Sequence, residues 1–240
     1  MSAAEDPLVG RTAVVTGASR GIGRAIAERL AEGGARVFGL GRSEASLRDL
    51  AKQTGAEPVV VDLSDDVALW DALDRLTEEL RGPPDVLVNG AGVFGMGPVA
   101  EETVRHLDLE LALNLRAPFL VVRALLPAML ERGSGLIVNV GSVAGRRAFP
   151  GNGAYSASKF GLRGFHEVLL EELRGTGVRA TLLEPAATDT PIWDPLDPDE
   201  NPLVPSRADM LLAADVADAA LFVATRPEHV RIPLLQIERS

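Results

Sequence analysis

Short apolar segments alternate with amphipathic segments from one end of the chain to the other. The apolar segments are rich in β-branched residues and predict strands, at residues 12–16, 36–40, 58–61, 86–88, 136–140, 178–183 and 232–237. Helical periodicity predicts helices near residues 22–32, 44–52, 65–81, 101–131, 154–174 and 213–225. Strands this apolar should be buried on both faces. The alternation therefore predicts an α/β fold, a Rossmann-type doubly wound parallel sheet of about seven strands with helices on both faces.

One segment interrupts this alternation. Residues 185–207 contain six prolines and no long periodic pattern. A loop of this length inside a compact domain is more often a lid than a linker, and only one helix and one strand are predicted after it. We therefore expect a single domain over residues 1–240, with residues 185–207 forming a lid over the substrate.

The composition excludes several classes of protein. The chain has no cysteine, which rules out disulfides and thiolate metal sites, and its three histidines lack ligand spacing, so we expect no metal. A net charge of −10 argues against nucleic acid or an anionic membrane as a partner. Residues 1–7 are acidic and lack the apolar core of a secretory leader, and charged residues interrupt every apolar stretch. We expect a cytoplasmic protein.

A glycine-rich turn, T-G-A-S-R-G-I-G at residues 16–23, joins the first predicted strand to the first predicted helix. Gly17 would permit the tight turn, Gly21 would let the backbone approach a phosphate, and Gly23 would let the helix pack on the strand. The start of the helix then offers N–H groups and a positive dipole to a pyrophosphate. No Gly-Lys-Ser/Thr follows, so this is not a Walker loop. The turn predicts a dinucleotide site.

The end of the second strand bears on the choice of dinucleotide. NAD-binding enzymes place a carboxylate there to accept the ribose hydroxyl, but this chain reads L-G-R-S at residues 40–43. Arg42 is placed to pair with a 2′-phosphate, and Arg20 in the glycine loop is a second cation for the same region. Either arginine alone could be a solvated surface residue. Together they favour NADP(H) over NAD(H).

The chain contains one tyrosine, and one of its two lysines follows four residues later, in Y-S-A-S-K at residues 155–159. On a helix Tyr155 and Lys159 share a face. An adjacent ammonium favours the phenolate and would lower the pKa of Tyr155, which suits general acid–base chemistry. The alternative is a surface pair. Ser142 follows the fifth strand, where ligands bind in such sheets, and its context lacks the G-x-S-x-G of a serine hydrolase.

With N-G-A-G at residues 89–92 and Asn114, these motifs resemble the short-chain dehydrogenase/reductase family from about residue 10 to the C-terminus. The resemblance implies a catalytic tetrad. Tyr155 would be the general acid in reduction and the base in oxidation, and Ser142 would orient the carbonyl. Lys159 would hold the nicotinamide ribose and lower the pKa of Tyr155, while Asn114 would fix a water in the proton relay.

The resemblance also implies the residues that bind the cofactor and the state of assembly. The expected cofactor contacts are Gly17, Ser19, Arg20, Gly21, Ile22, Gly23, Arg42, Ser43, Asp62, Leu63, Asn89, Ala91, Gly92, Tyr155, Lys159, Pro185, Thr188 and Thr190. Family members commonly assemble through the helices near 101–131 and 154–174, so we expect a homotetramer or at least a dimer. A leucine-rich stripe on the second of these helices, from Leu162 to Leu173, suits the core or a subunit contact.

Three departures from the family's pattern qualify these expectations. The usual N-N-A-G is N-G-A-G here, which removes a side chain thought to tie neighbouring strands, and the usual P-G is Pro185-Ala186. The C-terminal strand lacks the G-G turn typical of bacterial 3-oxoacyl reductases. The leading hypothesis is an NADP(H)-dependent oxidoreductase acting on a small carbonyl or alcohol. The alternatives are a catalytically silent NADP(H) sensor and a 3-oxoacyl thioester reductase; an extended-type epimerase would need a larger substrate region.

Overall fold

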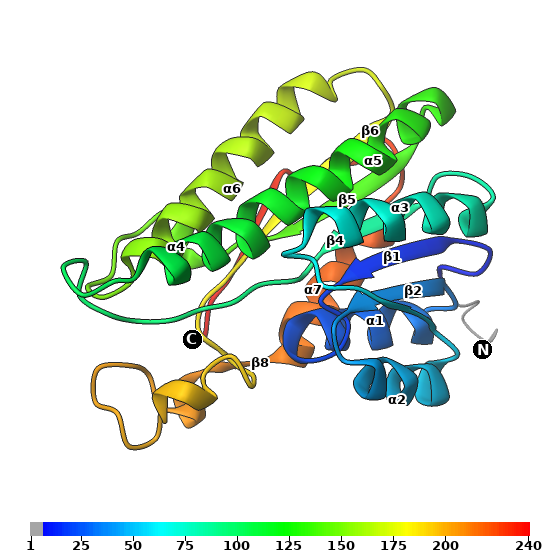
Figure 1. Ribbon diagram of the computed structural model, residues 1–240. Helices are drawn as coiled ribbons and strands as arrows, with labels where there is room; N and C mark the ends of the chain where they lie inside the picture. The colour runs from blue at the N-terminus through cyan, green and yellow to red at the C-terminus, as the bar shows by residue number, and fades with distance from the viewer. Residues whose placement is uncertain (1–6) are drawn as a thin grey trace.

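Seven parallel strands form the central sheet of the computed structural model, which describes residues 7–240 (Figure 1). The strand order is β3-β2-β1-β4-β5-β6-β9, so the sheet grows in one direction from β1 and then in the other from β4. The strands are β1 (Thr12–Thr16), β2 (Arg36–Gly41), β3 (Glu57–Val60), β4 (Val86–Asn89), β5 (Gly135–Val140), β6 (Val178–Pro185) and β9 (Leu234–Ile237). This is the doubly wound sheet that the sequence predicts.

Helices cover both faces of the sheet (Figure 1). One layer consists of α1 (Gly21–Glu32), α2 (Glu44–Thr54) and α7 (Ala213–Ala224), and the other of α3 (Asp66–Leu80), α4 (Val104–Leu111), α5 (Ala117–Arg132) and α6 (Gly153–Glu172). Successive side chains of a strand point to opposite faces, so Ala13 and Val15 join the core beneath α1 while Val14 joins the core beneath α3 and α5. Two buried faces explain why the strands are nearly continuous apolar runs.

The helix expected over residues 101–131 is interrupted. It begins at Val104, and residues Ala112–Arg116 between α4 and α5 form a π-helical turn. Pro118 has no amide hydrogen, so it cannot supply the α-helical bond to the carbonyl of Asn114. The N–H of Ala117 instead bonds to the carbonyl of Ala112, five residues back. The other expected elements differ by at most two residues at either end.

Residues 185–207 are more ordered than the sequence indicates. The segment contains β7 (Thr188–Asp189), which pairs with β8 (Leu211–Leu212), and a 3₁₀ turn at Asp194–Leu196. Arg207 bonds to Asp189 and Asp194 across the segment, and the indole N–H of Trp193 donates to the carbonyl of Thr188 at 3.0 Å. The sequence predicts a loop here without these short elements, because contacts of this kind leave no periodic pattern. Its action as a lid stays a prediction.

The leucine stripe of α6 belongs to the core of the chain itself. Leu162, Leu169 and Leu173 are at most 2% exposed. The apolar side chains that α5 and α6 leave exposed are different ones, among them Phe119, Phe160 and Val168. If the protein assembles through α5 and α6, these exposed residues and not the leucines would form the contact.

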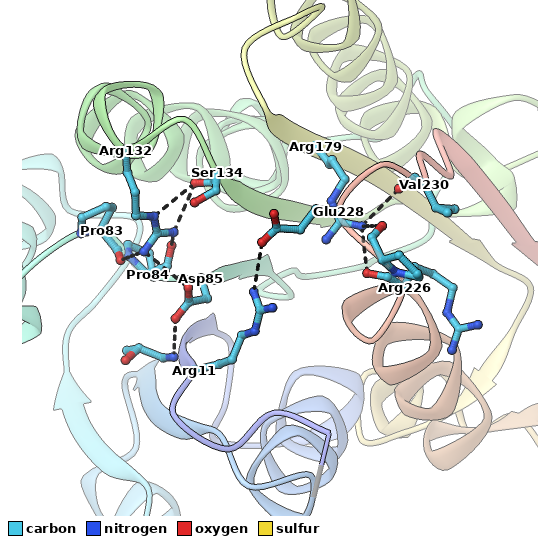
Figure 2. A network of polar contacts seen from close by, with 12 residues as sticks. Arg11, Pro83, Pro84, Asp85, Arg132, Ser134, Arg179, Arg226, Glu228 and Val230 are labelled. Carbon is cyan, nitrogen blue, oxygen red and sulfur yellow. Dashed lines mark hydrogen bonds and ion pairs between the residues drawn. The ribbon is translucent and has the colours of Figure 1, made fainter. Parts of the chain in front are cut away.

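Polar contacts tie the strands together at the edge where they begin (Figure 2). The backbone N–H of Thr12 donates to Asp85 at 2.8 Å, and Arg132 donates to the carbonyls of Pro83 and Pro84 at 2.8 Å each. The guanidinium of Arg179 reaches the carbonyl of Val230 at 3.1 Å. The loops at this edge are therefore pinned to one another, and the opposite edge, where the strands end, carries the cavity described below.

Two further expectations concern a membrane-spanning helix and a secretory leader. Within residues 7–240, none of the helices combines the length and the hydropathy that crossing a membrane requires. The expectation about a leader concerns the first residues of the chain, and residues 1–6 lie outside the part that the structure describes.

Candidate active site

A cavity of about 1190 Å³ lies at the carboxyl ends of the strands, between the glycine loop, the ends of β2, β4, β5 and β6, and the segment after Pro185. It brings together most of the predicted site residues, namely Gly17, Ser19, Arg20, Gly21, Ile22, Arg42, Leu63, Ala91, Gly92, Ser142, Tyr155, Lys159, Pro185, Thr188 and Thr190. Five others stand behind its wall, namely Gly23, Ser43, Asp62, Asn89 and Asn114. A cavity this large has room for a dinucleotide and a second molecule.

The glycine loop has the geometry of a phosphate cradle. Gly17 has φ of +75°, and a Cβ at this position would lie 2.7 Å from the backbone of Ala91. Gly21, where α1 begins, has φ of +59°. No side chain caps the start of α1, and its first turn carries no acidic residue. Its N–H groups and dipole therefore suit the pyrophosphate of a dinucleotide.

Gly23 and Ser43 do not line the cavity, but they support the elements around it. A Cβ at Gly23 would lie 2.5 Å from the carbonyl oxygen of Gly17, so only glycine lets α1 pack this closely on the loop. The hydroxyl of Ser43 accepts the N–H of Ser46 at 3.2 Å and caps α2. Both help to position elements around the cavity, and their contact with a cofactor stays a prediction.

Two cations stand at the corner where the sequence places a 2′-phosphate. Arg20 and Arg42 both line the cavity and are exposed. Arg42 shares its charge, because its Nη1 lies 3.9 Å from a carboxylate oxygen of Asp62. Partial burial raises the pKa of Asp62, but hydrogen bonds from Ser64 outweigh this and, with the charge of Arg42, hold it below its ordinary value. Asp62 is therefore an ionised partner that competes for Arg42.

The end of β2 leaves no room for a larger side chain without some movement. A Cβ at Gly41 would lie 3.1 Å from the hydroxyl oxygen of Ser19 and 3.2 Å from its Cβ. Ser19 thus fills the space in which NAD-binding enzymes place a carboxylate. The absence of an acid here is built into the packing of the glycine loop on β2.

Tyr155 and Lys159 project from one face of α6. The Nζ of Lys159 lies 5.7 Å from the centroid of the Tyr155 ring and donates to the carbonyl of Val140 at 3.0 Å. Lys159 is 5% exposed. Burial lowers the pKa of Lys159 to about 8, although the nearby carboxyl of Glu110 opposes this. The ammonium is held at the end of β5, where a ribose hydroxyl can reach it.

The pKa of Tyr155 differs from the expectation. We expected the ammonium to lower it, but burial raises the pKa of Tyr155 to about 12, and Glu110 adds to this rise. A hydrogen bond with Ser142 opposes the rise without overcoming it. Loss of hydration of the phenolate therefore dominates the pKa of Tyr155. The phenol is protonated at neutral pH and is ready to donate a proton.

Ser142 and Asn114 complete the tetrad from two other elements. The hydroxyl of Ser142 accepts the N–H of Ala144 at 3.1 Å. Asn114 lies in the π-helical turn and is fully buried, and its side chain bonds to the backbone of Val93 in both directions at 2.9 Å. It also donates to the hydroxyl of Ser158 at 3.0 Å. These three bonds of the Asn114 side chain all go to the protein, so it joins the loop after β4 to α6.

Gly90 stands where the family has a second asparagine, and hydrogen bonds of other residues join the neighbouring strands. Asn89 donates to Asn139 at 2.8 Å across β4 and β5. Asn139 contacts Nδ1 of His166 at 3.2 Å, and Nε2 of His166 donates to the carbonyl of Pro233 at 3.0 Å. Burial lowers the pKa of His166, which suits this neutral tautomer. Asn89 therefore supports the cavity from behind. A Cβ at Gly90 would lie 2.9 Å from a backbone oxygen, so glycine fits the close packing there.

The Pro185-Ala186 departure carries no strain. Within residues 7–240 the non-glycine residues with positive φ are Arg81 and Asp197, so Ala186 lies in an ordinary backbone region. Its N–H donates to the carbonyl of Ile237 at 2.9 Å, and its carbonyl accepts from the hydroxyl of Thr188 at 3.0 Å. The turn does not require glycine.

One residue of this site escaped the sequence analysis. Glu110 on α4 is fully buried and lies near Lys159, whose pKa it affects. The signal for it was its place one helical turn before Asn114, on the same face. Phe94 lies with its ring centroid 4.7 Å from that of Tyr155. Phe94 lines the cavity with its neighbours Val93 and Met96.

The match to known proteins agrees with this geometry. The family model for short chain dehydrogenase matches residues 11–201. The chain belongs to this family. A short chain dehydrogenase of Pseudocercospora fijiensis is 40% identical over 200 residues, which span 79% of this chain and 63% of that protein. The family is one of oxidoreductases, and the cavity lies where its members are expected to bind a dinucleotide.

Two solved structures share the fold over nearly the whole chain. A metagenomic short-chain oxidoreductase in complex with NADP is 33% identical with a TM-score of 0.83, and the match covers 98% of this chain and 99% of that one. A putative NAD(P) dependent gluconate 5-dehydrogenase from Beutenbergia cavernae with bound NADP is 32% identical with a TM-score of 0.88, covering 98% and 97%. Both neighbours hold NADP in their structures.

Proposed function

We propose that the protein is an NADP(H)-dependent oxidoreductase that interconverts a ketone or aldehyde and the corresponding alcohol. The observation that carries the proposal is the joint position of Tyr155, Lys159 and Ser142 around one cavity with the glycine loop. A nicotinamide cofactor, when bound, supplies the hydride. The uncapped start of α1 suits its pyrophosphate, and Arg20 and Arg42 suit a 2′-phosphate.

The side chains divide the remaining work among them. In reduction, the hydroxyl of Ser142 holds the substrate oxygen beside Tyr155, and the Tyr155 phenol donates its proton to that oxygen as the alcohol forms. Lys159 holds the ribose from the end of β5 and returns a proton to Tyr155. Asn114 keeps the loop at Val93 and the helix α6 in register, so that the hydroxyl and the ammonium face one point. In oxidation, the phenolate of Tyr155 accepts the proton.

The contacts of the site favour this reading over a silent NADP(H) sensor. A sensor needs the glycine loop, the arginines and a lysine that holds the ribose, but it has no use for a phenol that faces the same cavity beside Ser142. The position of Tyr155 therefore favours an enzyme. Residues 185–207, which contribute Thr188, Thr190 and Trp193 to the cavity, would close over the substrate.

The substitution Tyr155→Phe tests the proposal. It removes one hydroxyl and keeps the ring that packs on Phe94. General acid–base groups supply roughly 10²–10⁴-fold, so kcat for ketone reduction should fall in this range while the Kd for NADPH and the Tm stay near wild type. A variant that keeps more than about half of the wild-type kcat would refute the role of Tyr155. NADPH that binds but reduces no carbonyl compound would favour the sensor.

A further inference from the structure

The wall of the cavity beyond Tyr155 is aromatic and aliphatic. The ring of Phe94 packs edge-on against Tyr155 at 4.7 Å between centroids and against Trp193 at 5.0 Å. Met96 and Phe149 continue this wall. On the other side, the segment after Pro185 adds Ile192, Leu196 and Val204. A substrate whose carbonyl reaches Tyr155 must therefore place its other substituents against apolar groups.

The charged side chains of this half of the cavity are engaged by other groups. Arg146, beside it, pairs with buried Glu184 at 3.2 Å and with Glu238 at 2.5 Å, and Arg239 bonds to the carbonyl of Met210 at 3.2 Å. The guanidinium of Arg147 lies over the ring of Phe149, 5.3 Å from its centroid. Arg146 and Arg239 would have to leave these partners to bind a carboxylate or phosphate of the substrate. Arg147 has no acidic partner among residues 7–240 and is the cation to which an acid would bind.

We propose that the substrate is a neutral carbonyl compound with an aromatic or branched apolar substituent, which packs against Phe94 and Trp193. This inference rests on the proposed oxidoreductase function. An aromatic substituent gains edge-to-face contact with both rings, whereas a charged one loses hydration against an apolar wall beside which Arg146 and Arg239 already have partners. A small polyhydroxylated ketone leaves the apolar wall unfilled.

A matched pair of ketones tests this inference with NADPH and the wild-type enzyme. Ethyl benzoylformate and benzoylformate carry the same ring and ketone and differ in one charge. We expect kcat/KM for the ester to exceed that for the acid at least about tenfold, and dihydroxyacetone to be poorer than either. Trp193→Ala should lower kcat/KM for the ester roughly three- to tenfold, while Trp193→Phe, which keeps a ring, should lower it less.

Two results would overturn the substrate class. One is an acid or a polyhydroxylated ketone that reacts as well as the ester, and the other is a Trp193→Ala variant that lowers kcat/KM equally for aromatic and small aliphatic ketones. Either would leave the oxidoreductase function intact, because NADPH would still be consumed. Absence of NADPH turnover with every carbonyl compound would instead refute the function itself.

A second group of residues carries an independent inference. Glu110 on α4 is fully buried. Its Oε1 accepts the N–H of Gly95 at 2.9 Å, and its Oε2 has no hydrogen-bond partner within residues 7–240. Apolar residues would fill this space without leaving a carboxylate oxygen unpaired. The carboxyl therefore has a use other than packing.

A line of titratable groups leads from Glu110 to solvent. Nε2 of His106 lies 3.5 Å from Oε1 of Glu110, and Nδ1 of His106 lies 2.7 Å from Oε1 of Glu102. The side chain of Glu110 is 0% exposed, and those of Glu102 and His106 are 17% and 30% exposed. The ring of His106 lies against Gly95, where a Cβ would be 2.4 Å from it, so the loop holds the imidazole in place.

The loop that Glu110 binds also lies against the tetrad. Asn114 and Glu110 lie one turn apart and bond to the same loop, at Val93 and Gly95. The beginning of this loop touches the tetrad: a Cβ at Gly92 would lie 3.0 Å from Oδ1 of Asn114 and 3.8 Å from Nζ of Lys159. The titratable groups that act on Glu110, or that it acts on, are His106, Glu102, Lys159 and Tyr155.

We infer that Glu110 and His106 carry protons between solvent and Lys159. In each reduction Tyr155 gives one proton to the substrate oxygen and regains one from Lys159. Lys159 then regains its proton from Glu110, and Glu110 regains one from solvent through His106, so that one solvent proton is consumed for each carbonyl reduced. Glu110 acts through Lys159 and touches neither substrate nor cofactor.

The substitution Glu110→Gln separates this role from a structural one. The glutamine oxygen can still accept the N–H of Gly95, but the side chain no longer titrates. We expect kcat for reduction to fall roughly tenfold or more, with the KM for NADPH and ketone within about twofold of wild type. The solvent deuterium isotope effect on kcat should rise and the pH profile should change. His106→Gln should have a smaller effect in the same direction.

The alternative is that Glu110 only anchors the loop that carries Phe94. In that case Glu110→Gln would keep the wild-type kcat, isotope effect and pH profile, and Glu110→Ala would lose activity through the loss of the bond to Gly95. This pattern would overturn the inference. Glu101→Gln, on an exposed neighbouring carboxylate, is the matched control and should leave all three quantities unchanged.

Discussion

Replacing Arg42 by alanine tests the preference for NADP(H) without knowledge of the natural substrate. Arg42 and Arg20 are the cations at the corner of the cavity where a 2′-phosphate is expected. A hydrogen bond to a charged group contributes about 1.5–3 kcal/mol. The side chain of Arg42 is 60% exposed and shares its charge with Asp62 at 3.9 Å, so the loss should be about 1–1.5 kcal/mol, which is roughly five- to tenfold in Kd for NADPH.

The assay is a fluorescence titration of NADPH and of NADH at one ionic strength. Arg42→Ala should weaken NADPH and leave NADH within about twofold, since NADH presents no phosphate to that side chain. Arg20→Ala should act in the same way. The control is Arg48→Ala, which removes an equally exposed arginine paired with Glu44 on α2. Wild type that binds NADH as tightly as NADPH, or an Arg42→Ala variant that weakens both cofactors equally, would refute the reasoning.

Gly41→Asp extends the same test. It adds a charge that repels a 2′-phosphate and can accept a ribose hydroxyl, so it should favour NADH. The side chain must displace Ser19, whose hydroxyl would lie 3.1 Å from the new Cβ. Gly41→Ala imposes the same displacement without the charge. A shift toward NADH in the aspartate variant that is absent from the alanine variant therefore measures the electrostatic part alone.

Three further predictions concern stability, mobility and assembly. Burial raises the pKa of Glu110 from 4.5 to about 7, so the free-energy penalty for ionising it in the folded protein is absent below pH 4.5 and grows as pH rises through 7. Urea unfolding should therefore find Glu110→Gln more stable than wild type by about 3 kcal/mol at pH 8.5 and by little at pH 4.5. An equal difference at both pH values would contradict this. Hydrogen exchange in residues 185–207 should slow when cofactor and substrate bind, and equal protection with and without them would count against a lid. Light scattering should find a dimer or tetramer that Phe160→Glu disrupts, because Phe160 and Phe119 are 46% and 47% exposed on the expected contact face; a monomeric wild type would contradict assembly there.

The parts of the fold that follow from the sequence are those with a regular period. Continuous apolar strands and amphipathic helices predicted the sheet and both helical layers, because burial imposes those patterns on the residues themselves. The π-helical turn was not predicted, although Pro118 stands four residues after Asn114 and removes the amide that an α-helix needs there. Helical periodicity continues through such a turn almost unchanged, so only the position of the proline signals it.

The residues of the candidate site also differ in whether the sequence predicts them. Gly17, Tyr155 and Lys159 belong to short motifs whose spacing fixes their place, and Ser142 is placed by the end of the fifth strand. All four line the cavity. Glu110 has no motif, because its role depends on the loop at Gly95 that is folded over it. Contacts of this kind join residues that the sheet brings together, and no local pattern records them.

The environment of the cavity links the two inferences drawn from it. Burial raises the pKa of Tyr155 to about 12 and that of Glu110 to about 7, and lowers that of Lys159 to about 8. All three shifts favour the neutral form, so the cavity disfavours isolated charge. This is unfavourable for an anionic substrate and favourable for a neutral carbonyl compound.

The same shifts suit the transfer of a proton between Glu110 and Lys159. In water the pKa values of a carboxyl and an amine differ by about 6, so that a proton on the amine would rarely exchange with the carboxyl. At about 7 and about 8 the two groups differ by little, and moving a proton from Glu110 to Lys159 is favourable by on the order of 1.4 kcal/mol. Burial of Glu110 therefore lowers the stability of the fold at high pH, and the same burial makes its carboxyl an effective proton donor to Lys159. A carboxyl that kept its ordinary pKa would be ionised at neutral pH and would have no proton to give to Lys159.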